Sequence, residues 1–170
     1  LASALNDLAG CLVDQGRVDN EILALYQRAL DLFVLSGGDE QPDVANLLNN
    51  MAAFHYELGA YSRSEVFSKQ ALAVMDNLFN NESAVADTDE ETLLVCRQIQ
   101  QQALNHLATA LRAQGCYGAA ELYSLRALAL MEQHFGKDSE ETAESLNNLG
   151  VLYKYWGRYE KAEALYQKAF

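Results

Sequence analysis

Proline is almost absent from this chain of 170 residues, which carries a single one, Pro42. Proline interrupts helices and sheets, so long stretches without it leave regular structure unbroken. The chain is instead rich in Ala, Leu, Glu and Gln, which are good helix formers. We therefore expect helix almost throughout, no strands, and an all-α fold.

Basic residues are scarce as well. The 12 Lys and Arg are outnumbered by 24 Asp and Glu, which gives a formal net charge of -12. A surface of that sign repels nucleic acid phosphates and anionic lipid headgroups. Nucleic acids and membranes are therefore not expected among the partners.

Long apolar runs and a leader segment are missing too. No run approaches the roughly 18 apolar residues of a membrane-spanning helix, and no basic-then-apolar leader opens the chain. The three cysteines, Cys11, Cys96 and Cys116, are far apart and form no C-x-x-C motif, which argues against a disulfide framework and a zinc site. We expect a soluble, reduced, cytoplasmic protein without metal or cofactor.

Motifs of catalysis are equally lacking. The sequence contains no phosphate-binding G-x-x-x-x-G-K-[ST] loop, no G-x-G-x-x-G, no H-E-x-x-H and no G-x-S-x-G nucleophile elbow. His55, His106 and His134 fall in different surroundings, which is typical of structural histidines. The chain is therefore not expected to be an enzyme.

What the sequence does contain is an internal repeat. Four times an Asn in a helix-forming pattern is followed ten residues later by a Gly: Asn6/Gly16, Asn49/Gly59, Asn105/Gly115 and Asn147/Gly157. Each Gly precedes a second apolar-periodic run that ends in Ala: Ala29, Ala71, Ala127 and Ala169. A long fixed period of this kind is typical of stacked helical arrays.

Each copy has the pattern of two helices joined by a tight turn. Apolar residues recur at i, i+3 and i+7, as in Leu5, Leu8 and Leu12, which gives one apolar stripe per helix. The Gly suits a helix end that requires a positive φ. A small residue on the first helix lets the second approach closely: Ala9, Ala52, Ala108 and Gly150. Since one hairpin cannot bury its apolar face alone, four antiparallel hairpins, with eight helices, are predicted to stack.

The last copy and the segment before it read GKDSEETAESLNN (Gly136 to Asn148), LNNLxxLY (Leu146 to Tyr153) and GRYEKAEALYQKA (Gly157 to Ala169). This pattern resembles the tetratricopeptide repeat over the whole chain, specifically the long, 42-residue version of kinesin light chains. The resemblance implies a right-handed superhelix, an α-solenoid, that mediates protein–protein interactions. We place the repeats in a single array at about 1–38, 39–80, 88–136 and 138–170, and expect a fragment of a longer protein because the pattern is cut at both ends.

The spacing is irregular at one place. The Gly-to-Gly steps are 43, 56 and 42 residues, so the middle step carries 14 extra, of which 6 fall in a loop and 8 in a helix. Thr88-Asp89-Glu90-Glu91 has the pattern of a capping box, so this helix is expected to start near Asp89. Eight residues add about 12 Å, so the first helix of the third repeat should project.

The projecting helix carries apolar residues that need a cover: Leu93, Leu94, Val95, Cys96 and Ile99. Two interpretations remain open. Either the loop Asn80–Asp87 folds back over them, or they contact another chain or a flanking repeat. The first copy is also irregular, since Gly16 to Ala29 is one residue longer than its equivalents and Leu23 replaces a repeated Glu. Its turn should be distorted.

Family geometry implies that the repeated Asn residues point into a concave groove: Asn6, Asn49, Asn105 and Asn147. An Asn amide both donates and accepts, which matches a peptide bond; alternatively, these residues bond a neighbouring helix and fix the superhelix. The same face should carry Asn46, Gln102, Tyr56 and Thr109. Arg112 and Lys154 are candidate anchors for a ligand carboxylate, unless they merely form a solvated face.

The sequence thus predicts a protein–protein interaction scaffold that holds an extended peptide or partner segment in its groove, as in kinesin-light-chain-like adaptor repeats. The alternative is a structural or self-association segment of a larger signalling or motor-adaptor protein. In that case the 80–99 insert, through Leu93, Leu94 and Ile99, would form the contact and produce a homo-oligomer.

Overall fold

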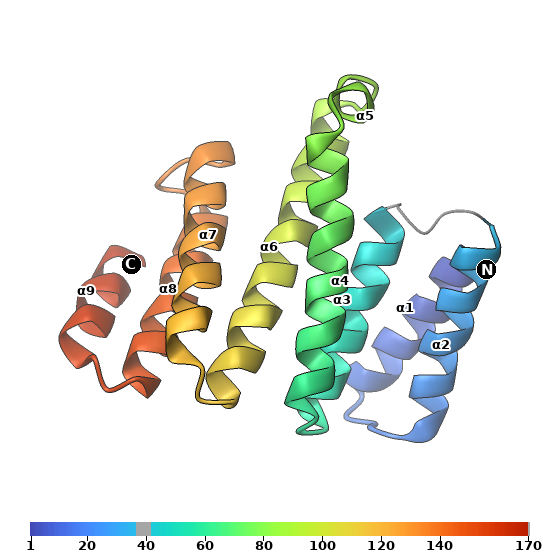
Figure 1. Ribbon diagram of the computed structural model, residues 1–170, viewed down its shortest axis with the longest axis horizontal. Helices are drawn as coiled ribbons and strands as arrows, with labels where there is room; N and C mark the ends of the chain where they lie inside the picture. The colour runs from blue at the N-terminus through green and yellow to red at the C-terminus, as the bar shows by residue number, and fades with distance from the viewer. Residues whose placement is uncertain (37–41, 170) are drawn as a thin grey trace.

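The computed structural model describes residues 1–36 and 42–169 and shows a row of paired antiparallel helices (Figure 1). The helices in these ranges are α1 (Ala2–Asp14), α2 (Asn20–Leu35), α3 (Pro42–Glu57), α4 (Tyr61–Asn80), α5 (Glu82–Ala86), α6 (Glu90–Ala113), α7 (Tyr117–His134), α8 (Glu140–Tyr155) and α9 (Tyr159–Ala169). Eight of them form the predicted four hairpins, which confirms the all-α solenoid. The short α5 is an additional helix that the prediction of eight lacked. The predicted boundary at 38/39 and residue 170 lie outside the described residues.

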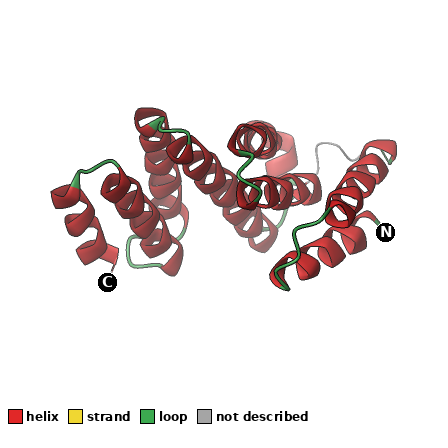
Figure 2. Cartoon of the chain, turned by 90° about the horizontal axis from the view of Figure 1, so that it is seen from below, coloured by secondary structure: helices red, strands yellow, loops and turns green. Residues whose placement is uncertain are grey.

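The hairpins stack into two layers. The first helices of the hairpins, α1, α3, α6 and α8, form one layer, in which α3 contacts α6 and α6 contacts α8. The second helices, α2, α4, α7 and α9, form the other. Seen from below, the helix pairs follow one another from the N-terminal to the C-terminal end (Figure 2). The two ends of the array are therefore far apart, and each hairpin contacts mainly its neighbours in sequence.

A glycine with positive φ closes the first helix of each hairpin. Gly59 has φ 71°, and the next residue, Ala60, donates its N–H to the carbonyl of His55, 2.9 Å away. Cys116, after Gly115, bonds the carbonyl of Leu111 in the same way. This is the closing bond of a Schellman motif, which glycine adopts without strain. The predicted role of the repeated glycines is confirmed.

The turn of the first hairpin differs from the others, as predicted. Helix α2 begins four residues after Gly16, whereas α4 begins two residues after Gly59. The extra length forms its own cap, because the Asp19 carboxylate accepts from the N–H groups of Glu21 and Ile22. Arg17 holds this cap in place through contacts of 2.8 Å to Asp19 and 2.6 Å to Glu21. The longer spacing therefore forms a separate, capped turn.

The insert lengthens the first helix of the third hairpin as predicted. Helix α6 has 24 residues and α8 has 16, a difference of 8. Its N-cap is Asp89, whose carboxylate accepts from the N–H of Thr92. The prediction of a capping box that starts at Thr88 is wrong, because the Thr88 hydroxyl donates to the carbonyl of Ala84 at the end of α5.

The extended α4 covers much of the projecting part of α6, and the two helices run side by side to the tip of the array (Figure 1). The guanidinium of Arg97 lies 3.3 Å from the centre of the Phe79 ring, and the Gln100 amide donates to Asp76 over 2.7 Å. Cys96 is buried, and burial raises the pKa of its thiol. The segment Asn80–Asp87, predicted as a loop, is mostly helical instead, since α4 extends to Asn80 and α5 spans Glu82–Ala86.

An aromatic residue at the contact between the first and second hairpins makes the stability of the fold depend on pH. Tyr26 is buried, and burial, with a smaller contribution from the Asp14 charge, raises the pKa of its hydroxyl to about 12. The unfolded chain ionises a tyrosine at about pH 10. Because the folded state retains the proton longer, stability is complete below about pH 10 and falls as pH rises towards 12.

We expect Tyr26→Phe to reduce this alkaline loss of stability, as measured by urea unfolding at about pH 8, 10 and 11. The reduction should be partial, because Tyr153 also has a pKa raised to about 12, first by burial and then by its hydrogen bond to Glu121. Tyr155→Phe is the control, since Tyr155 is exposed. A variant as alkali-sensitive as the parent would contradict the assignment.

Candidate functional site

Two small cavities lie between the first helices of successive hairpins. One, of about 140 Å³, lies between α3 and α6 and is lined by Ala53, Tyr56, Glu57, Ser64, His106 and Thr109. The other, of about 40 Å³, lies between α6 and α8 and is lined by Asn105, Ala108, Thr109, Arg112, Ser124, Asn148, Val151 and Leu152. Thr109 borders both. The two cavities therefore lie on either side of Thr109, across three helices, and together we call them the trough.

Arg112 links the walls of the trough. It stands in the last turn of α6, donates to the Tyr56 hydroxyl on α3 over 3.3 Å, and places its guanidinium 4.3 Å from the centre of the Tyr155 ring on α8. No acidic residue forms an ion pair with it among the described residues. No carboxylate therefore forms an ion pair with Arg112, which lies beside Tyr56 and Thr109.

The four repeated Asn residues are not equivalent. Asn49 is 1% exposed, and its Nδ2 donates to the main-chain carbonyl of Ile99 on α6 over 3.0 Å. Asn6 is also buried, and its side-chain oxygen accepts from Asn50 over 2.9 Å. Both contacts join neighbouring hairpins. At these two positions the geometry favours the second interpretation, in which Asn fixes the stacking of the array.

The other two Asn residues lie nearer the surface. Asn105 lines the trough and donates weakly to Glu144 over 3.4 Å, and Asn147 is exposed. Asn46 is half-buried and Gln102 is exposed, and neither lines the trough. The structure thus brings together Tyr56, Asn105, Thr109 and Arg112 from the predicted set.

The residue after each repeated Asn was missed by the sequence analysis. Asn50 bonds the preceding hairpin, while His106 and Asn148 line the trough. Burial lowers the pKa of His106, so its imidazole is neutral near pH 7. The sequence feature that could have predicted these contacts was the second Asn of the LNN motif. This is the residue that faces the preceding repeat.

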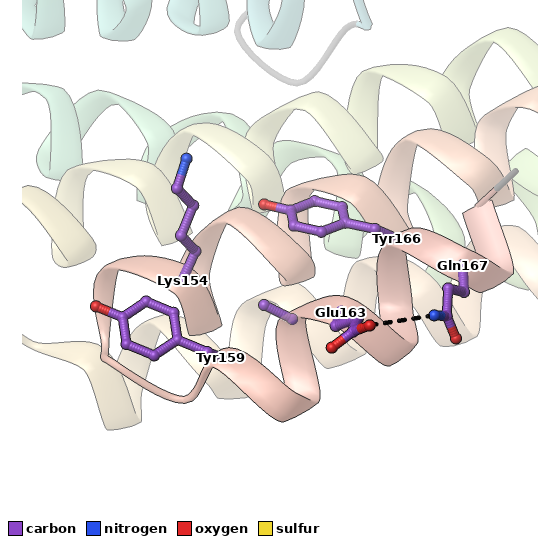
Figure 3. A pocket seen from close by; sticks show the side chains of 6 residues that line it. Lys154, Tyr159, Glu163, Tyr166 and Gln167 are labelled. Atoms are coloured by element: carbon purple, nitrogen blue, oxygen red, sulfur yellow. Dashed lines mark hydrogen bonds between the residues drawn. The ribbon is translucent and has the colours of Figure 1, made fainter.

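Lys154 lies apart from Arg112, at the last hairpin. It borders a cavity of about 730 Å³ with Tyr159, Ala162, Glu163, Tyr166 and Gln167 of α9. Figure 3 shows Lys154 beside Tyr159 and Tyr166, with Glu163 bonded to Gln167. The two predicted charge anchors therefore belong to different cavities. Glu163 lines the same cavity as Lys154, whereas the cavity beside Arg112 has no carboxylate in its lining.

Tyr166 packs unusually closely on Gly150. A Cβ atom built on Gly150 would lie 2.7 Å from Cε1 of Tyr166. In the two preceding hairpins the equivalent pairs are Ala52 with Ser68 and Ala108 with Ser124, by register from the repeated Asn and Gly. The last hairpin therefore joins a large residue on its second helix with glycine on its first.

The apolar residues predicted to form a second contact, on the projecting part of α6, are mostly buried or half-buried. Leu93 and Leu94 are half-buried, Ile99 packs on the core, and Val95 is 50% exposed. Within residues 1–36 and 42–169, no group of three or more His, Cys, Asp or Glu residues is arranged to hold a metal ion. None of the described helices has the length and apolarity needed to span a membrane.

Paired helices in register, stacked through small residues and closed by glycine, define a helical-repeat scaffold. The sequence matches the model of the tetratricopeptide repeat family over residues 1–77 and 100–170, and the chain belongs to this family. Only the insert falls between the matched segments. Repeats of this family generally mediate protein–protein interactions, and its members are typically non-enzymatic scaffolds.

Solved structures with the same architecture include BtubC (BKLC) from P. vanneervenii, with 25% identity and a TM-score of 0.78. The match covers 99% of this chain and 61% of that one, so the chain spans less than two thirds of that protein's length. Kinesin light chain TPR-like repeats from Podosopora anserina match with 14% identity and a TM-score of 0.43, covering 99% of this chain and 94% of that one. The family match confirms the predicted tetratricopeptide repeat. No protein with a curated description matches the sequence.

Proposed function

We propose that the chain binds an extended peptide or partner segment along the trough. The observation that carries this proposal is that two cavities, which share Thr109 in their linings, lie side by side across α3, α6 and α8. The first helices of three successive hairpins offer their side chains to a ligand at a regular spacing. Such a spacing suits a ligand with an extended backbone.

The lining indicates what such a segment would contain. Asn105 and Asn148 offer amides that can pair with peptide groups. Arg112 offers one cation, and Glu57 offers one carboxylate. The narrow space, of about 140 Å³ at its wider end, favours small side chains above Thr109. A mixed polar and apolar segment with one carboxylate fits this arrangement better than a strongly acidic one.

The proposal is tested with a random dodecamer peptide library displayed on phage and selected on the parent protein. The affinity of an enriched synthetic peptide is then measured by fluorescence anisotropy. Thr109→Trp should lower this affinity at least about tenfold, because the indole occupies both cavities at their junction. Arg112→Gln should weaken only peptides that carry a carboxylate.

Gln70→Trp is the matched control, since Gln70 is exposed on α4 and lines neither cavity. It should leave the affinity within about twofold. The circular dichroism spectra of all variants should coincide with that of the parent. Peptides that bind Thr109→Trp as tightly as the parent would place the binding surface elsewhere.

A further inference from the structure

A larger cavity lies in the other layer of the array, away from the trough. It has a volume of about 540 Å³ and lies between α2 and α4, with α3 as its floor. In Figure 1, α3 is visible behind the space between these two helices. Its lining is mainly apolar and consists of Asn20, Leu23, Ala24, Gln27, Met51, His55, Arg63, Val66 and Phe67.

Two departures from the repeat pattern meet in this cavity. Leu23 stands where the other copies have a carboxylate, at Glu65, Glu121 and Glu163. His55 stands where they have an apolar or aromatic residue, at Leu12, Leu111 and Tyr153. One exchange removes a charge from the wall, and the other adds a polar group to the floor. Plain stacking of hairpins requires neither exchange, because the other copies stack without them.

His55 is the polar group in the floor. It is 3% exposed, and its Nδ1 has no hydrogen-bond partner among the described residues. Its ring stacks on that of Phe67, with 5.2 Å between the ring centres. A buried polar atom without a partner costs stability, and Nδ1 of His55 is one of four such side-chain atoms in the described part of the chain. Burial, and then the charge of Arg63, lowers the pKa of His55, so the ring is neutral and able to donate from one nitrogen.

The rim of the cavity is positively charged. Arg63 is exposed and forms no ion pair with any described residue. No Asp or Glu is among the lining residues, although acidic residues outnumber basic ones 24 to 12 in the chain. The cavity therefore combines one available guanidinium, one neutral imidazole and apolar walls.

We propose that this cavity binds a small apolar carboxylate, of the class of medium-chain fatty acids, with its carboxylate at Arg63 and its chain along Leu23, Met51 and Phe67. The volume of about 540 Å³ falls within the usual range of small-molecule sites, roughly 300–1,000 Å³. An Arg–carboxylate contact supplies the charge-assisted bond, and the apolar walls supply the burial. This site is separate from the trough and does not depend on the proposed function.

Decanoate is the probe, used below its micelle concentration, and 1-decanol is its neutral counterpart. Binding is followed by two-dimensional ¹H–¹⁵N NMR. Decanoate should bind saturably with a stoichiometry of one, shift the amides of α2, α3 and α4 around the cavity, and bind at least about tenfold more tightly than decanol.

Arg63→Gln should weaken decanoate about tenfold and leave decanol unchanged. Arg28→Gln is the matched control, because Arg28 is an exposed arginine on α2 that does not line the cavity. Ala24→Trp should abolish binding of both probes by filling the space.

Three results would overturn the proposal. They are absence of saturable decanoate binding, equal affinity for decanol and decanoate, and decanoate binding that Arg63→Gln does not weaken. Equal affinities would point instead to an apolar side chain of a partner protein as the occupant. Failure of the peptide selection on the trough would leave these outcomes unaffected, since the two sites share no lining residue.

Discussion

Phe54→Ala is expected to lower the free energy of unfolding by about 3–5 kcal/mol, the usual cost of emptying a buried aromatic site. Phe54 is 2% exposed and lies in the last turn of α3. Its ring is edge-on to that of Tyr26 of the first hairpin, with 6.0 Å between the ring centres, and the centre of the His55 ring is 5.9 Å away. Removing it creates a cavity at the junction of the first two hairpins.

Urea unfolding followed by circular dichroism measures this loss. The control is Leu122→Ala, because Leu122 is 69% exposed on α7 and should change stability by no more than about 0.5 kcal/mol. A Phe54→Ala variant as stable as Leu122→Ala would show that the first hairpin is not held through this contact.

Gly150→Ala is expected to destabilise the last hairpin by about 1–3 kcal/mol, which reverses the usual sign of this substitution. Within a helix, alanine is normally better than glycine by about 0.5–1 kcal/mol. Here the added methyl group would stand 2.7 Å from the Tyr166 ring, and overpacking of that kind costs more than the helix gains.

A double-mutant cycle isolates this contact. In the Tyr166→Ser background, which restores the residue type of Ser68 and Ser124, Gly150→Ala should stabilise the protein. The matched control is Gly118→Ala, because Gly118 is a helical glycine with open space at the Cβ position. Additive effects of Gly150→Ala and Tyr166→Ser in urea unfolding would contradict the packing described here.

The fold could be predicted from sequence because its determinants are local. The spacing from Asn49 to Gly59 sets the length of one helix, and the positive φ of Gly59 sets its end. The eight extra residues of α6 could be counted from the spacing in the sequence for the same reason. The tip of the insert escaped prediction, since the choice of Asp89 over Thr88 as the cap depends on how α5 folds against it.

The site was less predictable, since it depends on contacts between hairpins. Asn49 and Asn147 occupy the same register, yet Asn49 is buried against Ile99 and Asn147 is exposed. What differs is the neighbouring helix: the long α6 passes over Asn49. Tyr56 and Arg112, which the sequence predicted for the groove, line the trough, while the contribution of Asn148 required the position of α8 against α6.

The long α4 and α6 have a consequence for the stiffness of the array. They pack against each other along their lengths, although they belong to different hairpins, whereas α1 and α2 reach the rest of the array mainly through α3. In a stack held by nearest-neighbour contacts, bending occurs where those contacts are fewest. The second and third hairpins should therefore move as one rigid block, with the first hairpin as a hinged arm whose swing opens or closes the space between α2 and α4.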